Sequence, residues 1–226
     1  MTKVMHKMPA RALAVLAAVA AFFLAADVQA NATEVVGNVQ GAGSPIAEST
    51  VTLYAASTGA PQQLAQGQTD ANGAFKLSAK PAPAESVLYV IAKGGIPIAA
   101  VNSGASDSIG LLTVLGTSAP RKITVNEFTT VASVWTCAQF LKGEVLSGKP
   151  LGLSIAAGNV TNFVNIETGG YGRAIQDALN STQTPTMANF ATLADVLAGC
   201  ITSRRVRAVV SLRLQRTPPA MSRQTR

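Results

Sequence analysis

The feature that most constrains the fold is a series of short apolar segments between residues 35 and 94, separated by Gly, Pro, Asn and Asp. The series begins VVGNVQGAGSPIAESTVTLYAAS and continues through GQTDANGAFKLSAK to VLYVIAKGG. Short apolar runs between turn-forming residues are typical of strands. Six or seven strands within about ninety residues predict an antiparallel β-sandwich.

Two patterns within this series predict individual strands. Val51, Leu53 and Ala55 alternate with Thr52 and Tyr54, which indicates a strand with one buried face. Residues 87–92, VLYVIA, are apolar at every position, as expected of a central strand that is covered on both faces.

A turn is predicted at residues 69–73, between segments 64–67 and 75–77. Asp70 and Asn72 can bond to their own backbone, and Gly73 can adopt a positive φ without a Cβ clash. We therefore expect a tight hairpin here. The segment also resembles the start of a calcium-binding loop, but Pro81 stands where that loop needs its bidentate Glu, so the hairpin is favoured.

These residues resemble the carboxypeptidase regulatory-like family, whose domains are transthyretin-like sandwiches of Greek-key type. The resemblance covers about residues 33–118, and Glu48 departs from it, since the family often has a glycine before the second strand. It implies an accessory module, often grouped with carbohydrate-binding-like folds, and not the peptidase itself. The matching residues are Gly37, Val39, Gly43, Pro45, Ile46, Val51, Thr52, Leu53, Tyr54, Thr69, Asp70, Asn72, Gly73 and Phe75.

The N-terminal segment has the composition of a secretory signal peptide. Lys3, Lys7 and Arg11 precede an apolar stretch that is too short to span a bilayer, and small residues precede Asn31. We therefore expect residues 1–30 to be cleaved near Ala30, leaving a secreted or periplasmic chain without a transmembrane segment. An uncleaved membrane anchor is the alternative.

The net charge of +7 resides at the two ends of the chain. Residues 31–202 carry eight basic and ten acidic side chains, a net charge of −2, which argues against nucleic-acid binding by the folded part. Residues 203–226 contain seven arginines and no acidic residue. We expect this tail to be disordered. It is either an arm for nucleic acid or anionic lipid, or, as its abrupt change of composition favours, an out-of-frame translation.

Residues 119–202 change to helical periodicity, so the predicted class is α+β: a β-sandwich over residues 31–118 followed by a small helical region. Thr124 and Glu127 have the spacing of a capping box. Two apolar stripes follow at helical spacing, and we expect the helices that carry them to pack together. The stripes are Phe128, Val131, Trp135, Ala138 and Leu141, and Met187, Phe190, Ala194, Leu197 and Ile201.

This half resembles a helical region of bacterial secreted proteins, in which it follows a regulatory-like sandwich. The segments that carry the resemblance are NEFTTVASVWTCAQFL, GLSIAAGNVTNFVNIETGG and LNSTQTPTMANFATLADVLAGC. Longer members continue past this region, some into propeller-like repeats, whereas this chain departs at Ser203, which favours truncation. The resemblance implies no functional residue.

The sequence offers few side chains for catalysis. His6 is the only histidine and lies in the predicted signal peptide, so the mature chain cannot form a Ser-His-Asp triad or a histidine-bearing zinc site. We expect no catalytic residue, cofactor or metal.

Trp135 and Tyr171 have rings that could stack on a sugar, but the apolar stripe favours core packing for Trp135. Tyr54 is the better candidate for an exposed ring.

Cys137 and Cys200 lie near the apolar stripes of the two long predicted helices. An oxidising compartment permits a disulfide between them. The alternative is two buried free thiols, which behave as small apolar side chains.

The sequence therefore predicts a non-enzymatic secreted or periplasmic accessory or interaction module, of carbohydrate-binding-like fold, with a cell-envelope protein or a glycan as partner. One alternative is a truncated fragment of a longer envelope enzyme or propeller-bearing protein. The other is binding of anionic membrane or nucleic acid through the arginine tail.

Overall fold

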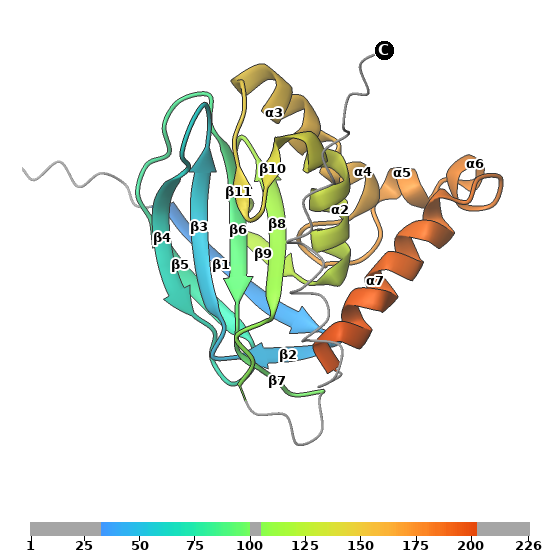
Figure 1. Cartoon of the computed structure of the whole chain (residues 1–226), viewed down its shortest axis with the longest axis horizontal. Coiled ribbons are helices and arrows are strands. Elements are labelled where there is room, and N and C mark those ends of the chain that lie inside the picture. Colours follow the sequence, from blue (N-terminus) through green and yellow to red (C-terminus); the bar gives the residue numbers. More distant parts are fainter. Residues whose placement is uncertain (1–32, 100–104, 203–226) are drawn as a thin grey trace, which may run out of the picture. The chain divides into compact units, whose positions relative to one another are not determined.

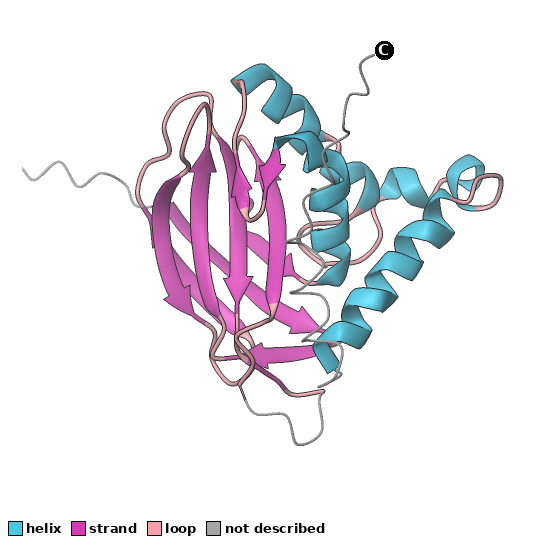
Figure 2. Ribbon diagram, viewed as in Figure 1, coloured by secondary structure: helices cyan, strands magenta, loops and turns pink. Residues whose placement is uncertain are grey.

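The structure, a computed structural model, describes residues 33–99 and 105–202 (Figure 1). Two sheets and a group of helices make an α+β fold, which confirms the predicted class (Figure 2). The expected signal peptide and the arginine tail lie outside the described residues. Among the described residues, no helix has both the length and the apolar character needed to cross a membrane.

The first sheet is built around the long strand β1 (Thr33–Gly41). β5 (Ala74–Ala79) pairs with it antiparallel along one edge, and β9 (Lys122–Val125) pairs with it in parallel along the other. β2 (Ser44–Ala47) and β7 (Ile96–Pro97) extend the sheet in the order β5-β1-β2-β7. The sequence did not predict β9, because the spacing of Thr124 and Glu127 indicates a capping box at these residues.

The second sheet has the order β4-β3-β6-β8 and is antiparallel throughout. Apolar side chains from both sheets are buried in one core. β6 is buried at its first six positions, as the uninterrupted apolar run predicted. The strands are β3 (Thr50–Ala56), β4 (Gln62–Gln68), β6 (Val87–Lys93) and β8 (Gly110–Gly116).

The predicted turn at residues 69–73 forms, but it does not close a hairpin. The Asp70 carboxylate accepts hydrogen bonds from the Asn72 and Ala74 amides, both at 2.8 Å, and Gly73 has φ 72°. The strands on either side belong to different sheets, since β4 pairs with β3 and β5 pairs with β1. The turn therefore carries the chain from one sheet to the other.

β3 is also more deeply buried than its alternating sequence predicted. Thr52 is buried, and the half-buried Tyr54 stacks on Tyr89 of the neighbouring strand with the ring centroids 5.2 Å apart. The prediction of a strand with one solvent-facing side was wrong, because Thr52 and Tyr54, on the second face, are buried and half-buried.

Glu48, the departure from the family pattern, adopts φ 56° directly after β2, in the turn that leads to β3. Only glycine enters this left-handed region without a steric penalty from Cβ. The Glu48 amide donates to the Thr69 carbonyl at 3.1 Å, which helps to hold the turn in this conformation. The chain thus keeps a backbone geometry that favours glycine while carrying a glutamate.

Helices cover the side of the molecule where β8 lies (Figure 1). α2 (Glu127–Cys137) contacts β8, and α3 (Pro150–Gly158) contacts β6 and β8. α7 (Thr186–Thr202), the longest helix among the described residues, packs on α2. The remaining short elements are η1 (Ala138–Phe140), β10 (Leu141–Lys142), β11 (Val145–Leu146), α4 (Val160–Phe163), α5 (Arg173–Gln176) and α6 (Ala178–Ser181).

α2 begins two residues later than the predicted capping box. Asn126 is the N-cap and accepts from the Thr129 amide at 3.0 Å, while the Thr129 hydroxyl accepts from the Asn126 amide at 2.9 Å. Thr124 is instead the third residue of β9, and its hydroxyl donates to the Glu167 carbonyl. The predicted pairing of Thr124 with Glu127 was therefore wrong, because β9 extends through Val125.

Candidate functional site

An apolar groove of about 300 Å³ lies between α2 and α7. The predicted packing of these two helices is confirmed, and Phe190, Ala194 and Ile201 of the second stripe are buried. The groove lies where the side chains of α2 and α7 do not meet, on the side of the helices that faces solvent. It is lined by Thr130, Val131, Val134 and Trp135 of α2 and by Leu193, Val196 and Leu197 of α7.

Four large apolar side chains at the groove remain open to solvent. Val134, Trp135, Leu193 and Val196 are between 44% and 58% exposed. The prediction that Trp135 packs in the core was therefore wrong. α2 turns its Thr and Ser side chains toward β8, and this rotates Trp135 outward.

The exposed faces of α2 and α7 are almost free of charge. Their charged residues are Glu127 and Asp195, and Glu127 is buried. Exposed apolar side chains that are contiguous and uncharged mark interaction surfaces on soluble proteins. Val134, Leu193 and Val196 were not singled out from the sequence as a surface. The available signal was that Leu193 and Val196 are apolar but do not belong to the predicted stripe of the last helix.

A cluster of aromatic rings supports the groove from beneath. Trp135 stacks on Phe163 with centroids 6.1 Å apart, and Phe163 lies 5.8 Å from Phe190. Phe190 in turn contacts Phe128 at 5.8 Å and Tyr171 at 6.1 Å. The five rings join α2, α4 and α7, and Phe163 supports one face of the Trp135 ring.

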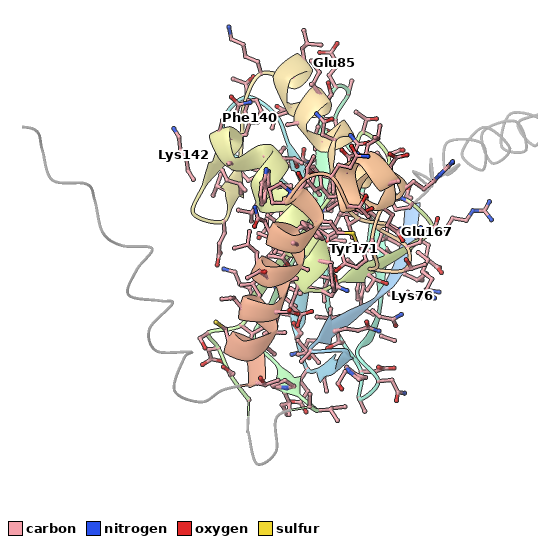
Figure 3. The ribbon with its side chains drawn as sticks, turned by 90° about the vertical axis from the view of Figure 1, so that its right-hand side faces the viewer. Lys76, Glu85, Phe140, Lys142, Glu167 and Tyr171 are labelled. Carbon is pink, nitrogen blue, oxygen red and sulfur yellow. The ribbon has the colours of Figure 1, made fainter. Side chains whose placement is uncertain are left out.

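Tyr171, at the far end of this cluster, lines a cleft of about 550 Å³ whose lining is partly apolar and partly polar. Figure 3 labels Tyr171 and Glu167, which both line this cleft. Asn165, Glu167 and Arg173 line the same cleft, and no ion pair of Glu167 or Arg173 is found among the described residues. The loop that carries Asn165 and Glu167 is held by β9, because the Thr124 amide donates to the Ile166 carbonyl at 2.8 Å. The cleft therefore has a fixed floor and several polar groups available to a ligand.

Cys137 and Cys200 are free thiols in this structure, with Cys137 fully buried and Cys200 half-buried. Burial raises the pKa of the Cys137 thiol, which keeps it protonated and unreactive. Pairing of the two cysteines in an oxidising compartment stays a prediction. We expect mass spectrometry on denatured, unreduced protein to detect two alkylated cysteines if they stay free and none if they are bridged.

Glu127, the first residue of α2, is buried and has a role beyond the predicted capping box. Its Oε1 accepts a hydrogen bond from the Ala42 amide in the turn between β1 and β2. Burial raises the pKa of Glu127 above its ordinary value, and the hydrogen bond from Ala42 offsets part of this rise. Glu127 thus links the start of α2 to the first sheet through this hydrogen bond. Ionisation of the buried carboxyl group lowers the stability of the folded protein.

We expect Glu127→Gln to change how stability depends on pH. Because the folded-state pKa is raised, the folded protein binds more protons than the unfolded chain between the ordinary and the raised pKa. Wild-type stability should therefore fall as the pH rises through that window, and the glutamine variant should lack this fall. Urea unfolding followed from pH 4 to pH 8 measures the difference. Glu167→Gln, at an exposed carboxylate, is the control and should keep the wild-type profile.

Within the described part of the chain, no group of three or more His, Cys, Asp or Glu side chains is placed to hold a metal ion. Asp70, considered from the sequence as the start of a calcium loop, uses its carboxylate to close the turn.

Comparison with known proteins gives no family. No protein-family model matches the chain, and no curated protein matches it. Among solved structures, part of the chain is similar to part of a 9R-lipoxygenase from Cyanothece PCC8801, with a TM-score of 0.25 and 14% sequence identity. The match covers 42% of this chain and 16% of the lipoxygenase. A likeness this weak carries no argument about fold or function.

Proposed function

We propose that this protein is a non-enzymatic accessory module of the bacterial cell exterior, which binds an apolar, uncharged helical segment of a cell-envelope protein in the α2–α7 groove. The observation that carries the proposal is the groove itself, where Val134, Trp135, Leu193 and Val196 are open to solvent. Burying such side chains contributes about 25 cal/mol per Å² of apolar surface. Charged segments are disfavoured, because the groove offers no charge to pair with them.

We further propose that the two sheets form a transthyretin-like sandwich of Greek-key type, related to carboxypeptidase regulatory-like domains. Support comes from the shared core of the sheets, the Asp70–Gly73 turn and the left-handed Glu48 where that family prefers glycine. In this proposal the sandwich is the scaffold, and the helices that cover β8 form the binding surface.

Trp135 provides the test, because it is the only tryptophan of the chain and lies in the groove. A synthetic amphipathic helical peptide, with Leu and Ala on one face and Gln and Ser on the other, should shift the Trp135 emission to shorter wavelength and saturate. A peptide of the same composition with its apolar residues scattered around the helix is the control. Val196→Glu should weaken binding at least tenfold. A saturation curve that is the same for both peptides would contradict the proposal.

A glycan is the second candidate ligand, favoured by the cleft beside Tyr171. An aromatic ring together with Asn, Glu and Arg side chains can stack on a sugar ring and bond to its hydroxyl groups. A glycan array should then give a signal that Glu167→Gln and Arg173→Gln both reduce. A signal unchanged in both variants would exclude this cleft. The two remaining alternatives, truncation and binding through the arginine tail, concern residues outside the described ranges and stay predictions.

A further inference from the structure

Two exposed lysines stand on the outer face of the first sheet. Along β1, β5 and β9, residues that face the core alternate with residues that face away from it. Val36 of β1 faces away and lies directly between Lys76 of β5 and Lys122 of β9, which are both exposed. Because neighbouring strands are about 4.8 Å apart, the Cα atoms of these lysines lie about 10 Å apart across the sheet.

This outer face continues into the cleft of about 550 Å³ described above. Pro120 lines the cleft and is followed directly by the exposed Arg121 and by Lys122. Thr124 lies on the same face of β9 as Lys122, and its hydroxyl donates to the Glu167 carbonyl at 2.9 Å. The strand and the wall of the cleft are therefore held together, and a ligand can contact both.

The charge of this surface is opposite to that of the rest of the chain. Its acidic residues are Glu34, which pairs with Lys76 at 2.7 Å, and Glu167. Figure 3 shows Lys76 and Glu167 on one side of the molecule and Lys142 on the opposite side. The basic residues, which we call the basic face, are Lys76, Arg121, Lys122 and Arg173.

Four basic and two acidic side chains give this surface a charge of +2. The remainder of residues 31–202 has four basic and eight acidic side chains, a charge of −4. Opposite potentials on two parts of one molecule orient a charged partner as it approaches. An anionic ligand is therefore drawn to the basic face and repelled by the rest of the described chain.

The side chains near the lysines favour a sugar polymer over other anionic partners. Asn38 and Ser78 share the outer face of the sheet and can bond to hydroxyl groups, and the Tyr171 ring in the cleft can stack on a sugar. None of the large exposed apolar side chains of the described residues belongs to β1, β5 or β9. The face thus lacks the apolar anchors with which a peripheral protein enters a membrane.

We infer that the basic face and the adjoining cleft together bind a polysaccharide that carries carboxylate groups. The inference rests on the second candidate function, glycan binding in the cleft, and names the class of glycan. Lys76 and Lys122 pair with carboxylates as point charges, and Arg173 can hold one carboxylate through two parallel hydrogen bonds. Exposed ion pairs are individually weak and are screened by salt, so the affinity should be modest and should fall as ionic strength rises.

The test is binding of the mature chain to immobilised polygalacturonate, measured by biolayer interferometry. Fully methyl-esterified polygalacturonate has the same sugar backbone without the charge, and poly-L-glutamate has the carboxylates without the sugar rings. Polygalacturonate should bind more tightly than either control ligand. Binding should weaken steadily as sodium chloride is raised from about 20 mM to about 500 mM, where the Debye length becomes shorter than the reach of these side chains.

Variants on the basic face locate the binding site. Lys122→Glu should weaken binding to polygalacturonate by about tenfold, because it replaces an attraction by a repulsion, and Arg173→Gln should weaken it by a smaller factor. The matched control is Lys142→Glu on β10, an exposed lysine on the opposite side of the molecule, which should bind like the wild type. Circular dichroism checks that the variants remain folded.

Three outcomes would overturn the inference. Equal binding to polygalacturonate and its methyl ester would leave a cleft for neutral glycans and keep the second candidate function. Equal binding to poly-L-glutamate would assign the basic face to acidic peptides. Equal binding by Lys122→Glu and Lys142→Glu would place the anion elsewhere on the chain. Binding to no glycan at all would remove both this inference and the second candidate function, and would leave the proposal for the α2–α7 groove untouched.

Discussion

Replacing Phe190 with alanine should lower the free energy of unfolding by about 3–5 kcal/mol. Phe190 is fully buried, and its ring lies about 6 Å from the rings of Phe128, Phe163 and Tyr171, so its removal leaves a cavity at the centre of the aromatic cluster. α7 has only two other buried residues, Ala194 and Ile201. The helix should therefore be released at much lower urea concentration than the sheets, and the groove should be lost with it.

Urea unfolding followed by Trp135 fluorescence and by far-ultraviolet circular dichroism measures this effect. The matched control is Leu193→Ala on the same helix, where the side chain is 44% exposed; it should cost less than about 1 kcal/mol. Equal losses for the two variants would show that α7 is not anchored through Phe190. In Phe190→Ala, the transitions followed by fluorescence and by circular dichroism should occur at different urea concentrations. If they coincide, as they do for a protein that unfolds in one step, α7 is not released separately.

Much of the fold could be predicted from hydrophobic periodicity, because that signal reports directly on burial. The uninterrupted run at residues 87–92 became a strand buried at each of these positions, and Phe190, Ala194 and Ile201 took the buried face of α7. The turn at Asp70–Gly73 formed for the local reason given, the side chain of Asp70 bonding to nearby amides. These features depend on neighbours in the sequence.

Features that depend on distant partners were not predictable in this way. The same turn could close a hairpin or connect two sheets. It connects two sheets because β5 pairs with β1, a strand some forty residues earlier in the chain. β9 was missed because its partner is also β1, in parallel. The disulfide prediction has the same difficulty, since it requires the relative rotation of α2 and α7.

The candidate site was mispredicted at Trp135 because an apolar stripe was assumed to face the core. α2 instead buries Thr129, Thr130 and Ser133 against β8. β8 is the edge of its sheet, and the edge has backbone amides that need acceptors. Hydroxyl side chains satisfy that need, so the polar face of α2 turns inward and part of its apolar face becomes the groove.

Removing the two hydroxyls that accept from β8 should therefore have one of the largest effects on stability. The Leu112 amide donates to Thr130 Oγ1 at 3.0 Å, and the Val114 amide donates to Ser133 Oγ at 2.8 Å. Thr130→Val and Ser133→Ala leave these buried amides without an acceptor, at a cost of about 1–3 kcal/mol each. The double variant should lose about 2–6 kcal/mol, a large part of the stability of a typical domain.

The control for this pair is Thr136→Val on the same helix. The Thr136 hydroxyl donates to the Ala132 carbonyl at 2.9 Å, within α2, so its loss leaves no β8 amide unpaired and should change stability by less than about 0.5 kcal/mol.

Hydrogen exchange at the Leu112 and Val114 amides distinguishes a local effect at the edge of the sheet from a general loss of stability. Both amides should exchange faster in the double variant, beyond what the global loss of stability explains. If all three single variants cost the same, the hydroxyls do not protect the edge, and the inward rotation of α2 needs another cause. If only the Leu112 and Val114 amides exchange faster in the double variant, the two hydroxyls protect the edge of the sheet. The need for these acceptors then explains why α2 turns its polar face inward and leaves the groove outside.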